Sequence, residues 1–259
     1  MKQTHSIAEL KALARECMLG KYGTAIALTL LIQAISAGIS LILEFAIDSY
    51  TVYGLIILNI INLIITFVMY IFSVGMCRFF LNAAKEQPIQ VSDLFYGFSH
   101  HPDKAILIGL FLFLCAIVCC IPFIGFMVAY VMTKSMAFMV ASTLSFLLAL
   151  AAVFYISFTY NLSLYLLADG LHECSVRQLL EKSRELMTGN RFRYFYMMVS
   201  FLGWFLLGMI SCGIAYLWIL PYMNCTAALF YLDLTGTLPS DTEVLQPEQN
   251  VTNDAFTSE

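Results

Sequence analysis

Few residues in this chain could do chemistry, and most of them lie inside long apolar stretches. Glu44 stands near the end of the first such stretch, and Asp48 follows four residues later. An ionisable group inside a membrane span is a candidate for function by default, whereas a carboxylate near the end of a span more often reaches the interface. We therefore interpret Glu44 as a paired or snorkelling carboxylate, and we expect Lys134 to be its partner at the outer surface.

Uncharged amides inside the same stretches form a second group of candidates. Such side chains commonly hydrogen-bond between helices, at about 0.6 kcal/mol each, and this interpretation is favoured over substrate binding. The amides of this group are Gln33, Asn59, Asn62, Asn161 and Asn224.

Two prolines interrupt apolar stretches. Pro122 and Pro221 each remove a helical hydrogen bond, and the carbonyl groups that they free could line a cavity or coordinate a substrate. A static kink that is packed against protein is the simpler alternative.

The sequence has no signature of an enzyme or of a metal site. Its four histidines lack a ligand spacing such as HExxH, and there is no GxSxG, P-loop or GxGxxG. Its eight cysteines show no CxxC spacing, so we expect reduced thiols. A pI near 5.5 lacks the basic footprint of a nucleic-acid-binding protein. We predict no catalysis, no metal, no cofactor and no nucleic-acid partner.

The composition shows which elements must hold these residues. Hydrophobic residues make up 61% of the chain and charged residues 12%, against roughly 45–50% and about 25% in soluble domains. Six stretches reach the ~20 residues that a membrane-spanning helix needs. We therefore predict an all-α, polytopic helical membrane protein with six spans arranged as three hairpins. The spans are predicted at residues 24–47, 53–77, 105–131, 137–161, 192–211 and 214–234, with possible extensions of the second to 84 and of the fourth to 168.

The positive charges set the orientation of these spans. With six spans and the N-terminus inside, 12 of the 13 Lys and Arg residues lie in cytoplasmic segments, and only Lys134 faces outward. Seven spans would move the five cations between Arg177 and Arg193 outside, which rejects that alternative. The membrane domain, 24–234, then follows a cytoplasmic amphipathic helix, 1–23, and precedes a disordered acidic tail, 235–259, with both termini in the cytoplasm.

Two cytoplasmic segments, Ser6–Gly20 and Ser175–Gly189, resemble each other when Ser6 is aligned with Ser175. Each opens with a capping box, completed by Glu9 or Gln178, and ends at a glycine. Each therefore predicts an amphipathic helix that leads into a span. Duplication and convergent capping chemistry both explain the likeness, and residues 92–97 form a weaker third copy.

Basic residues in and just after these two segments are expected to meet anionic lipid headgroups, so that the bilayer is the first predicted partner. They are Lys11, Arg15, Lys21, Arg184, Arg191 and Arg193.

A set of residues between positions 166 and 234 also carries a family resemblance. The set comprises Asp169, Ser183, Met187, Gly189, Asn190, Ser200, Gly203, Trp204, Gly213, Trp218, Pro221, Tyr222 and Tyr231. With the N-terminal LGKYG, these positions resemble the bacterial integral membrane proteins of the DUF975 family, a domain of unknown function. The resemblance implies a polytopic helical protein of the bacterial cytoplasmic membrane and brings no established activity. The chain departs from the family at Gly170-Leu171, where Asn-Pro usually follows the aspartate, and at Ala152-Val153, where Pro-Gly is usual.

Two functions fit these observations. The first is a non-catalytic membrane scaffold, or an accessory or assembly subunit, that binds a membrane or cytoplasmic protein. The alternative is a transporter or lipid-handling carrier that uses the proline-broken third and sixth spans. A cavity lined by Asn59, Asn62, Pro122 and Pro221 would favour the carrier, and a solid six-helix core would favour the scaffold.

Overall fold

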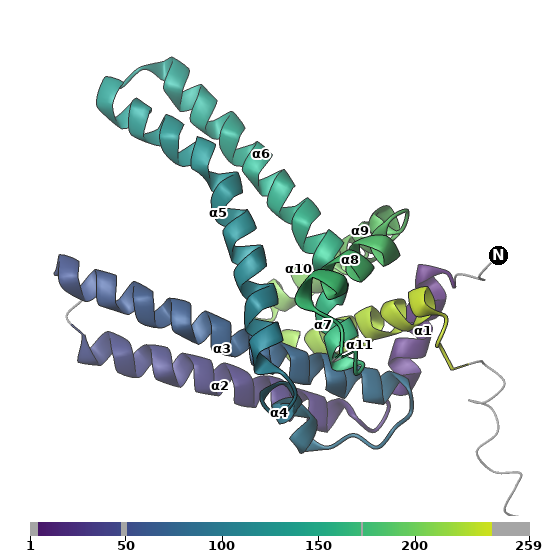
Figure 1. Ribbon diagram of the computed structural model, residues 1–259. Helices are drawn as coiled ribbons and strands as arrows, with labels where there is room; N and C mark the ends of the chain where they lie inside the picture. Colours follow the sequence, from purple (N-terminus) through teal and green to yellow (C-terminus); the bar gives the residue numbers. More distant parts are fainter. Residues whose placement is uncertain (1–4, 48–50, 172, 240–259) are drawn as a thin grey trace, which may run out of the picture.

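The structure, a computed structural model, describes residues 5–47, 51–171 and 173–239 (Figure 1). Every regular element in these ranges is a helix, which confirms the predicted all-α class. In chain order the helices are α1 (Ile7–Cys17), α2 (Tyr22–Ala46), α3 (Val52–Ala84), η1 (Val91–Phe95), α4 (Tyr96–Ser99), α5 (Pro102–Thr133), α6 (Met136–Tyr160), α7 (Leu162–Ala168), α8 (Val176–Met187), α9 (Arg191–Val199), α10 (Leu202–Ile210) and α11 (Tyr216–Thr235).

Within these described ranges, five helical segments are long and apolar enough to cross a membrane. They are α2, α3, α5, the continuous run of α6 and α7, and the run of α9 and α10. The predicted extensions to residues 84 and 168 are present. The predicted sixth span corresponds to α11, which is not among the five. Most of α11 is instead buried by the rest of the chain, so a six-span arrangement as three hairpins stays a prediction.

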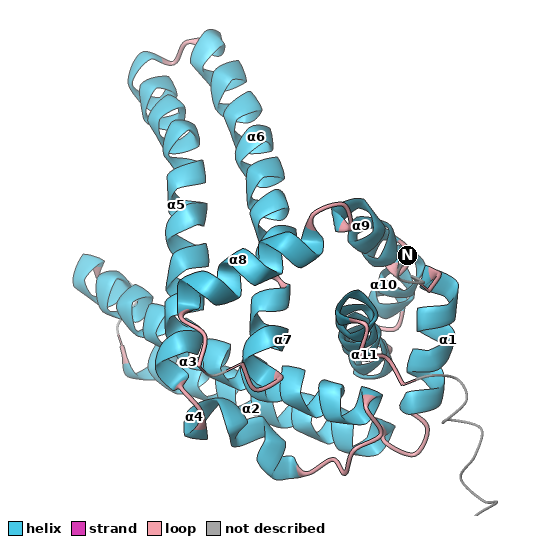
Figure 2. Cartoon of the chain, turned by 45° about the vertical axis from the view of Figure 1, so that its right-hand side comes forward, coloured by secondary structure: helices cyan, strands magenta, loops and turns pink. Residues whose placement is uncertain are grey.

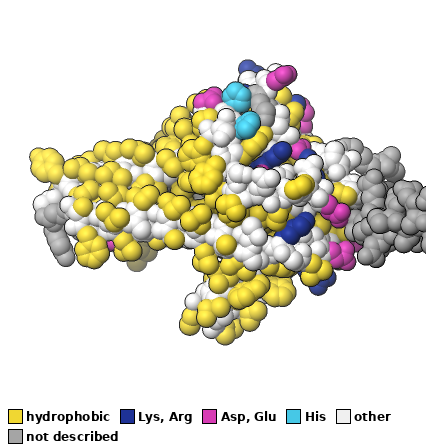
Figure 3. Space-filling view, turned by 90° about the horizontal axis from the view of Figure 1, so that it is seen from below, with side chains coloured by type: hydrophobic (Ala, Val, Ile, Leu, Met, Phe, Trp, Pro, Cys, Tyr) yellow, Lys and Arg dark blue, Asp and Glu magenta, His cyan; other side chains and the backbone are white. Residues whose placement is uncertain are grey.

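Two long helix pairs project from a common base. In Figures 1 and 2 the pair of α2 and α3 and the pair of α5 and α6 point in different directions. In the most apolar 18-residue stretch of α2, only 6% is buried inside the protein. The corresponding share is 11% in α3, in α5 and in the α6–α7 run. Apolar side chains cover these arms, while acidic and basic side chains gather over the base (Figure 3). The arms therefore expose the surface that a bilayer would cover.

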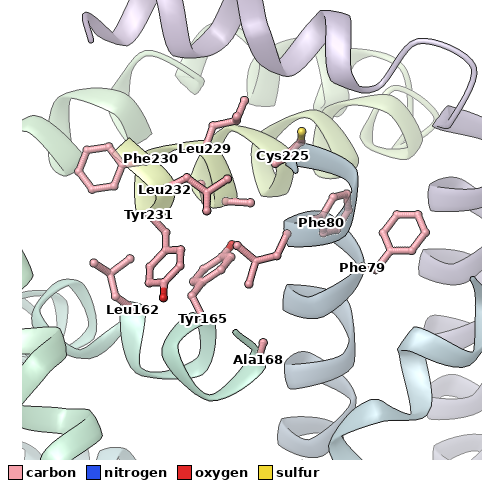
Figure 4. Close-up of a cluster of buried hydrophobic side chains, with 14 of the residues drawn as sticks. Phe79, Phe80, Leu162, Tyr165, Ala168, Cys225, Leu229, Phe230, Tyr231 and Leu232 are labelled. Atoms are coloured by element: carbon pink, nitrogen blue, oxygen red, sulfur yellow. The ribbon is translucent and has the colours of Figure 1, made fainter. Parts of the chain in front are cut away.

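The base holds the core of the molecule. The ends of α3 and α11 meet α7 there, and their side chains interdigitate (Figure 4). Phe79 and Phe80 come from α3, Tyr165 from α7 and Tyr231 from α11, and all four are buried. The rings of Tyr165 and Tyr231 stack with their centroids 5.8 Å apart. Below, "the base" means this core together with α1, η1, α4 and α8.

The two capping boxes form as predicted. Ser6 accepts a hydrogen bond from the Glu9 amide at 3.2 Å, and the Glu9 carboxylate accepts from the Ser6 amide at 2.7 Å. The Ser175 hydroxyl accepts from the Gln178 amide at 3.4 Å, and the Gln178 side chain accepts from the Ser175 amide at 2.8 Å. These bonds satisfy backbone donors that the first turn of a helix leaves free.

The two segments also end and pack alike. Gly20 and Gly189 have φ values of 74° and 82°, a left-handed conformation that favours glycine. The next helices, α2 and α9, begin at Tyr22 and Arg191, which are equivalent in the same alignment. Both helices bury one stripe completely, at positions that the alignment also makes equivalent: Leu10, Ala14 and Met18 in and just after α1, and Leu179, Ser183 and Met187 in α8.

The third segment departs from this pattern. Gly97 lies inside α4 and not at a helix stop. A Cβ on Gly97 would lie 2.4 Å from the backbone oxygen of Ile71, so the glycine serves the close packing of α4 on α3.

The short basal segments pack in a cyclic order: each lies against the helix pair that precedes it in the chain, and the first of them lies against the last helix. η1 and α4 pack against α3, and α8 packs against α6 and α7, so each lies on the helix that completes the preceding pair. α1 has no pair before it and packs against α11, the last helix (Figure 2). The long helices keep the same order, because α5 contacts α3, α9 contacts α6, and α2 contacts α11. The first and last parts of the chain are therefore joined at the base.

Candidate functional site

A groove of about 370 Å³ opens between α2, α3, α7 and α11, next to the core of the base. Three of the predicted candidates, Gln33, Asn161 and Asn224, line it. Its other polar neighbours are Thr29, Ser73 and Tyr165, and the remaining eight residues of its wall are apolar or cysteine. No Asp, Glu, Lys, Arg or His belongs to the wall that the described residues form.

Several polar groups of this groove already make hydrogen bonds within the protein. Thr29 and Ser73 donate to the backbone oxygens one turn before them, at 2.8 Å and 2.9 Å. The Asn161 amide donates to the Tyr194 hydroxyl at 2.6 Å, which links the α6–α7 junction to α9. The amides of Gln33 and Asn224 make no hydrogen bond within the described part of the chain. Asn161 thus bonds between helices as expected, while Gln33 and Asn224 remain open to a ligand.

The other sequence candidates lie outside this groove. Asn59 is exposed and donates to the Leu55 oxygen of its own helix at 2.8 Å. Asn62 is exposed as well, and so is Pro122, which lies inside an uninterrupted α5. Pro221 is buried in α11. Three of these four residues face outward from the arms, so the four do not converge on the cavity that would have favoured the carrier.

Glu44 and Lys134 are not brought together. Glu44 is exposed near the end of α2, while Lys134 joins α5 to α6, and the tips of the two pairs diverge (Figures 1 and 2). The Lys134 ammonium lies 5.9 Å from the centroid of the Tyr130 ring instead. The described residues contain no ion pair of Glu44, so the predicted Glu44–Lys134 pair is wrong. Asp48 lies outside the described residues.

A buried charge cluster at the base was missed by the sequence analysis. The Asp233 carboxylate accepts from the Nδ1 and the backbone amide of His5, at 2.9 Å and 3.1 Å. Its other oxygen accepts from the Arg193 guanidinium at 2.6 Å, and Arg193 also donates to the His5 oxygen. This cluster ties the N-terminal segment to α9 and α11. One sequence signal pointed to it, since Asp233 is the only acidic residue between positions 214 and 234.

A second cluster joins two positions of the family resemblance. Asp169, just after α7, forms an ion pair with Lys85 and accepts from the Tyr231 hydroxyl at 3.0 Å. Arg78 donates to the neighbouring Ala168 oxygen at 3.0 Å. The aspartate therefore links the ends of α3, α7 and α11, which makes it a structural residue of the base even though Asn-Pro does not follow it.

Some other positions of the resemblance also make hydrogen bonds at the base. The Ser183 hydroxyl donates to the Thr159 oxygen at 2.9 Å, and the Tyr222 hydroxyl donates to the Lys11 oxygen at 3.2 Å. Asn190 donates to the Leu186 oxygen at 3.0 Å. Other positions play different local parts: Met187 is buried, Gly189 and Gly213 have positive φ, Ser200 accepts from Lys11, Gly203 faces open space, and Trp204 and Trp218 are exposed.

The predicted headgroup-binding cations divide into two groups. Arg15 and Arg184 are exposed. The other four contact protein: Lys11 donates to the Ser200 oxygen and lies over the Phe201 ring, Lys21 donates to the Ala83 oxygen, Arg191 lies over the Tyr155 ring, and Arg193 pairs with Asp233.

Lys11 illustrates the cost of such a contact. Burial lowers the pKa of its ammonium group from the usual value, and the nearby Arg15 lowers it further. Two of the six cations, Arg15 and Arg184, thus remain free to face lipid, whereas the sequence analysis expected all six to do so.

A comparison with family models decides the relationship of the chain. A model described as a protein of unknown function, DUF975, matches residues 1–237. The chain belongs to the DUF975 family. The DUF975 match covers far more than the segments that carry the sequence resemblance, and it includes every helix described above. Searches of curated proteins and of solved structures found no match.

Among the described residues, no group of three or more His, Cys, Asp or Glu side chains is arranged to hold a metal ion. In the groove between α2, α3, α7 and α11, polar side chains without hydrogen bonds among the described residues meet an open space.

Proposed function

We propose that this DUF975 protein is a non-catalytic integral membrane protein that acts by binding, as a scaffold or as an accessory or assembly subunit. The exposure of its arms supports this proposal. Membrane helices associate through packing of their surfaces, and those of α2, α3, α5 and α6 are largely unused by the chain itself. Another membrane protein can cover these surfaces.

The distribution of charge also supports a binding function. The ionic contacts of the base, Asp233 with Arg193 and the half-buried pair of Asp169 with Lys85, join helices to one another. Neither pair lies in the groove wall. Such contacts hold a platform together, and they place no acid or base where a substrate would meet it.

The proposal places the base in the bacterial cytoplasm. The positive-inside rule supports this orientation, because 12 of the 13 Lys and Arg residues fall in segments on that side. Both termini would then be cytoplasmic, and a protein partner could also reach the base from the cytoplasm.

Site-specific photo-crosslinking in native membranes tests the proposal. A photoreactive residue at Ile42 on α2, or at Leu148 on α6, reports what covers each arm, since both side chains are well exposed. We expect a discrete protein adduct from at least one arm, and the adduct disappears when the purified chain is irradiated in detergent. Adducts with lipid alone, from every position along both arms, would overturn the scaffold proposal.

A second candidate function, a lipid-handling carrier, is favoured by the groove between α2, α3, α7 and α11. A carrier needs a site inside the membrane with polar groups that can meet a headgroup, and Gln33 and Asn224 supply such groups. Movement of a labelled lipid between the leaflets of vesicles that contain the purified chain tests this candidate, with protein-free vesicles as the control.

A further inference from the structure

We propose that the groove between α2, α3, α7 and α11 binds one uncharged amphiphile, an acylglycerol whose hydroxyl or ester head is held by the amides of Gln33 and Asn224. The inference deepens the carrier candidate, on which it rests, by naming the class of its ligand. Binding itself does not require transport, so the two can be tested apart.

The depth of the polar groups is the first argument. Gln33 lies about three helical turns after the start of α2, while Ser73 and Asn224 lie about three turns before the ends of α3 and α11. Each of these helices starts or ends at the base, so all three residues stand about 16 Å from it along their helices. Three helices therefore bring their polar side chains to one level, inside the segment of α2 that is long enough to span a membrane.

The unused hydrogen-bonding capacity is the second argument. An amide carries two donors and two acceptor sites, and in hydrocarbon these groups need partners. Ser73 and Asn161 have found theirs within the protein, whereas Gln33 and Asn224 have none among the described residues. Asn224 is half-buried, and Gln33 is exposed on α2. A ligand that enters from the membrane can reach both amides.

The absence of charge in the described wall sets the kind of headgroup. No Asp, Glu, Lys, Arg or His lines this groove. A phosphate or an ammonium at this depth would have no counter-ion within the wall, which is costly in a membrane. Hydroxyl and ester groups carry no such cost, and amides can both donate to them and accept from them.

The apolar part of the wall suits an acyl chain. Met69 and Met76 offer flexible, polarizable side chains, and Phe72 and Leu220 are among the other apolar residues of the wall. The volume of about 370 Å³ falls in the range of small-molecule sites. The groove would hold the head of the ligand and the first part of its acyl chain, while the rest of the acyl chain extends along the exposed arms.

Photolabelling with a neutral lipid tests this inference. The purified full chain is placed in nanodiscs of phosphatidylglycerol and phosphatidylethanolamine, with a diacylglycerol that carries a diazirine in one acyl chain. We expect labelled peptides from α3, α7 or α11. Labelling should fall about fivefold to tenfold in the double variant Gln33→Leu/Asn224→Leu, since two hydrogen bonds to the ligand are lost.

Matched variants separate a lost site from a lost fold. Asn59→Leu also removes an amide from a span, but this amide lies outside the groove and bonds within its own helix, so labelling should be unchanged. Gln33→Leu alone changes a side chain that makes no hydrogen bond among the described residues, and it should lower labelling while the unfolding temperature stays constant. Equal labelling of the double variant and the wild type would overturn the inference.

The remaining outcomes distinguish the ligand class from the carrier function. Stronger labelling by a phosphatidic acid with the same diazirine, also dependent on Gln33 and Asn224, would overturn the acylglycerol as ligand and leave the carrier candidate standing. Labelling by diacylglycerol without movement between leaflets would support the site and contradict the carrier.

Discussion

Single residues hold the base of this DUF975 protein together at points that are far apart in sequence. Asp233 has a side chain that is 1% exposed, and it bonds both His5 and Arg193. Breaking a buried pair by removing one partner is costly, because the other charge stays buried without compensation. Within its cluster, one nitrogen of the Arg193 guanidinium already lacks a partner, so that side chain has little tolerance for further loss.

At this scale we predict that Asp233→Asn lowers the free energy of unfolding of the base by about 3 kcal/mol. The reason is that Arg193 would keep its position beside Phe230 without a full counter-charge. Thermal or denaturant unfolding of the purified chain measures the effect. Glu181→Gln is the matched control: Glu181 pairs with Arg177 at 2.8 Å, but the two side chains are 55% and 87% exposed, so no measurable loss is expected. Equal stability of the two variants would contradict the assigned role.

Among the elements, α3 serves as the surface on which the second basal segment packs. η1 and α4 lie against it, and two glycines permit the approach. A Cβ on Gly75 would lie 2.0 Å from the backbone oxygen of Leu94, whereas a Cβ on Gly38 of α2 or Gly125 of α5 would meet nothing within 4 Å. Packing therefore requires a glycine at position 75 but not at position 38 or 125.

The corresponding element-scale prediction is that Gly75→Ala and Gly38→Ala change stability in opposite directions. Gly75→Ala forces η1 away from α3 and lowers the unfolding temperature. Gly38→Ala and Gly125→Ala fill open space in helix interiors and stabilise by about 0.5–1 kcal/mol. Unfolding curves of the three variants, recorded in one detergent, check the ordering. A Gly75→Ala protein as stable as the wild type would show that η1 does not pack as described.

What the sequence predicts well at this scale is local. The capping boxes of Ser6 and Ser175 and the stops at Gly20 and Gly189 depend on neighbours within a few residues, so the ends of α1 and α8 could be anticipated. Apolar length likewise predicts the five spans. The burial of α11 by the rest of the protein could not be predicted in this way, because an apolar helix has the same sequence pattern whether lipid or protein covers it.

The candidate site was predictable only in part, for the same reason. Gln33, Asn161 and Asn224 stand out as amides in apolar stretches, but their convergence on one groove depends on tertiary placement. Glu44 likewise does not meet Lys134 because the two arms diverge. The sequence around these two residues does not predict the directions of the arms.

For the whole molecule, the orientation in the membrane leads to a labelling prediction. Cys174 lies at the base, just before α8, and Cys212 is an exposed residue in the turn between α10 and α11. The α9–α10 run begins at residue 191 and ends at 210, about 29 Å away along its axis, so the two ends face opposite sides. In variants that keep one cysteine, an impermeant thiol reagent added to protoplasts should modify Cys212 and leave Cys174 unmodified. Rapid labelling of Cys174 from outside would show that the protein has the opposite orientation in the membrane.

The cyclic packing order leads to a prediction about how the chain can be reconnected. Each helix pair starts and ends at the base, α1 closes the order by packing on α11, and His5 lies within hydrogen-bonding distance of Asp233. Both ends of the described chain thus lie on one side of the molecule. Joining Pro239 to His5 through a Gly/Ser linker of about ten residues, which spans roughly 17 Å, and opening the chain within residues 86–90 should preserve every pair and every contact between basal segments.

We expect this circular permutant to insert in membranes and to unfold within a few degrees of the wild type, because surface connections tolerate new termini. A second permutant, joined in the same way but opened between α2 and α3 at residues 48–50, is the matched control. It would place both new termini at the tip of an arm, on the side opposite His5 and Pro239, and it would separate α2 from α3 in the sequence. This control should fail to insert or should aggregate. If the first permutant fails while the second folds, the cyclic order at the base does not organise the molecule, and the link between α2 and α3 is dispensable.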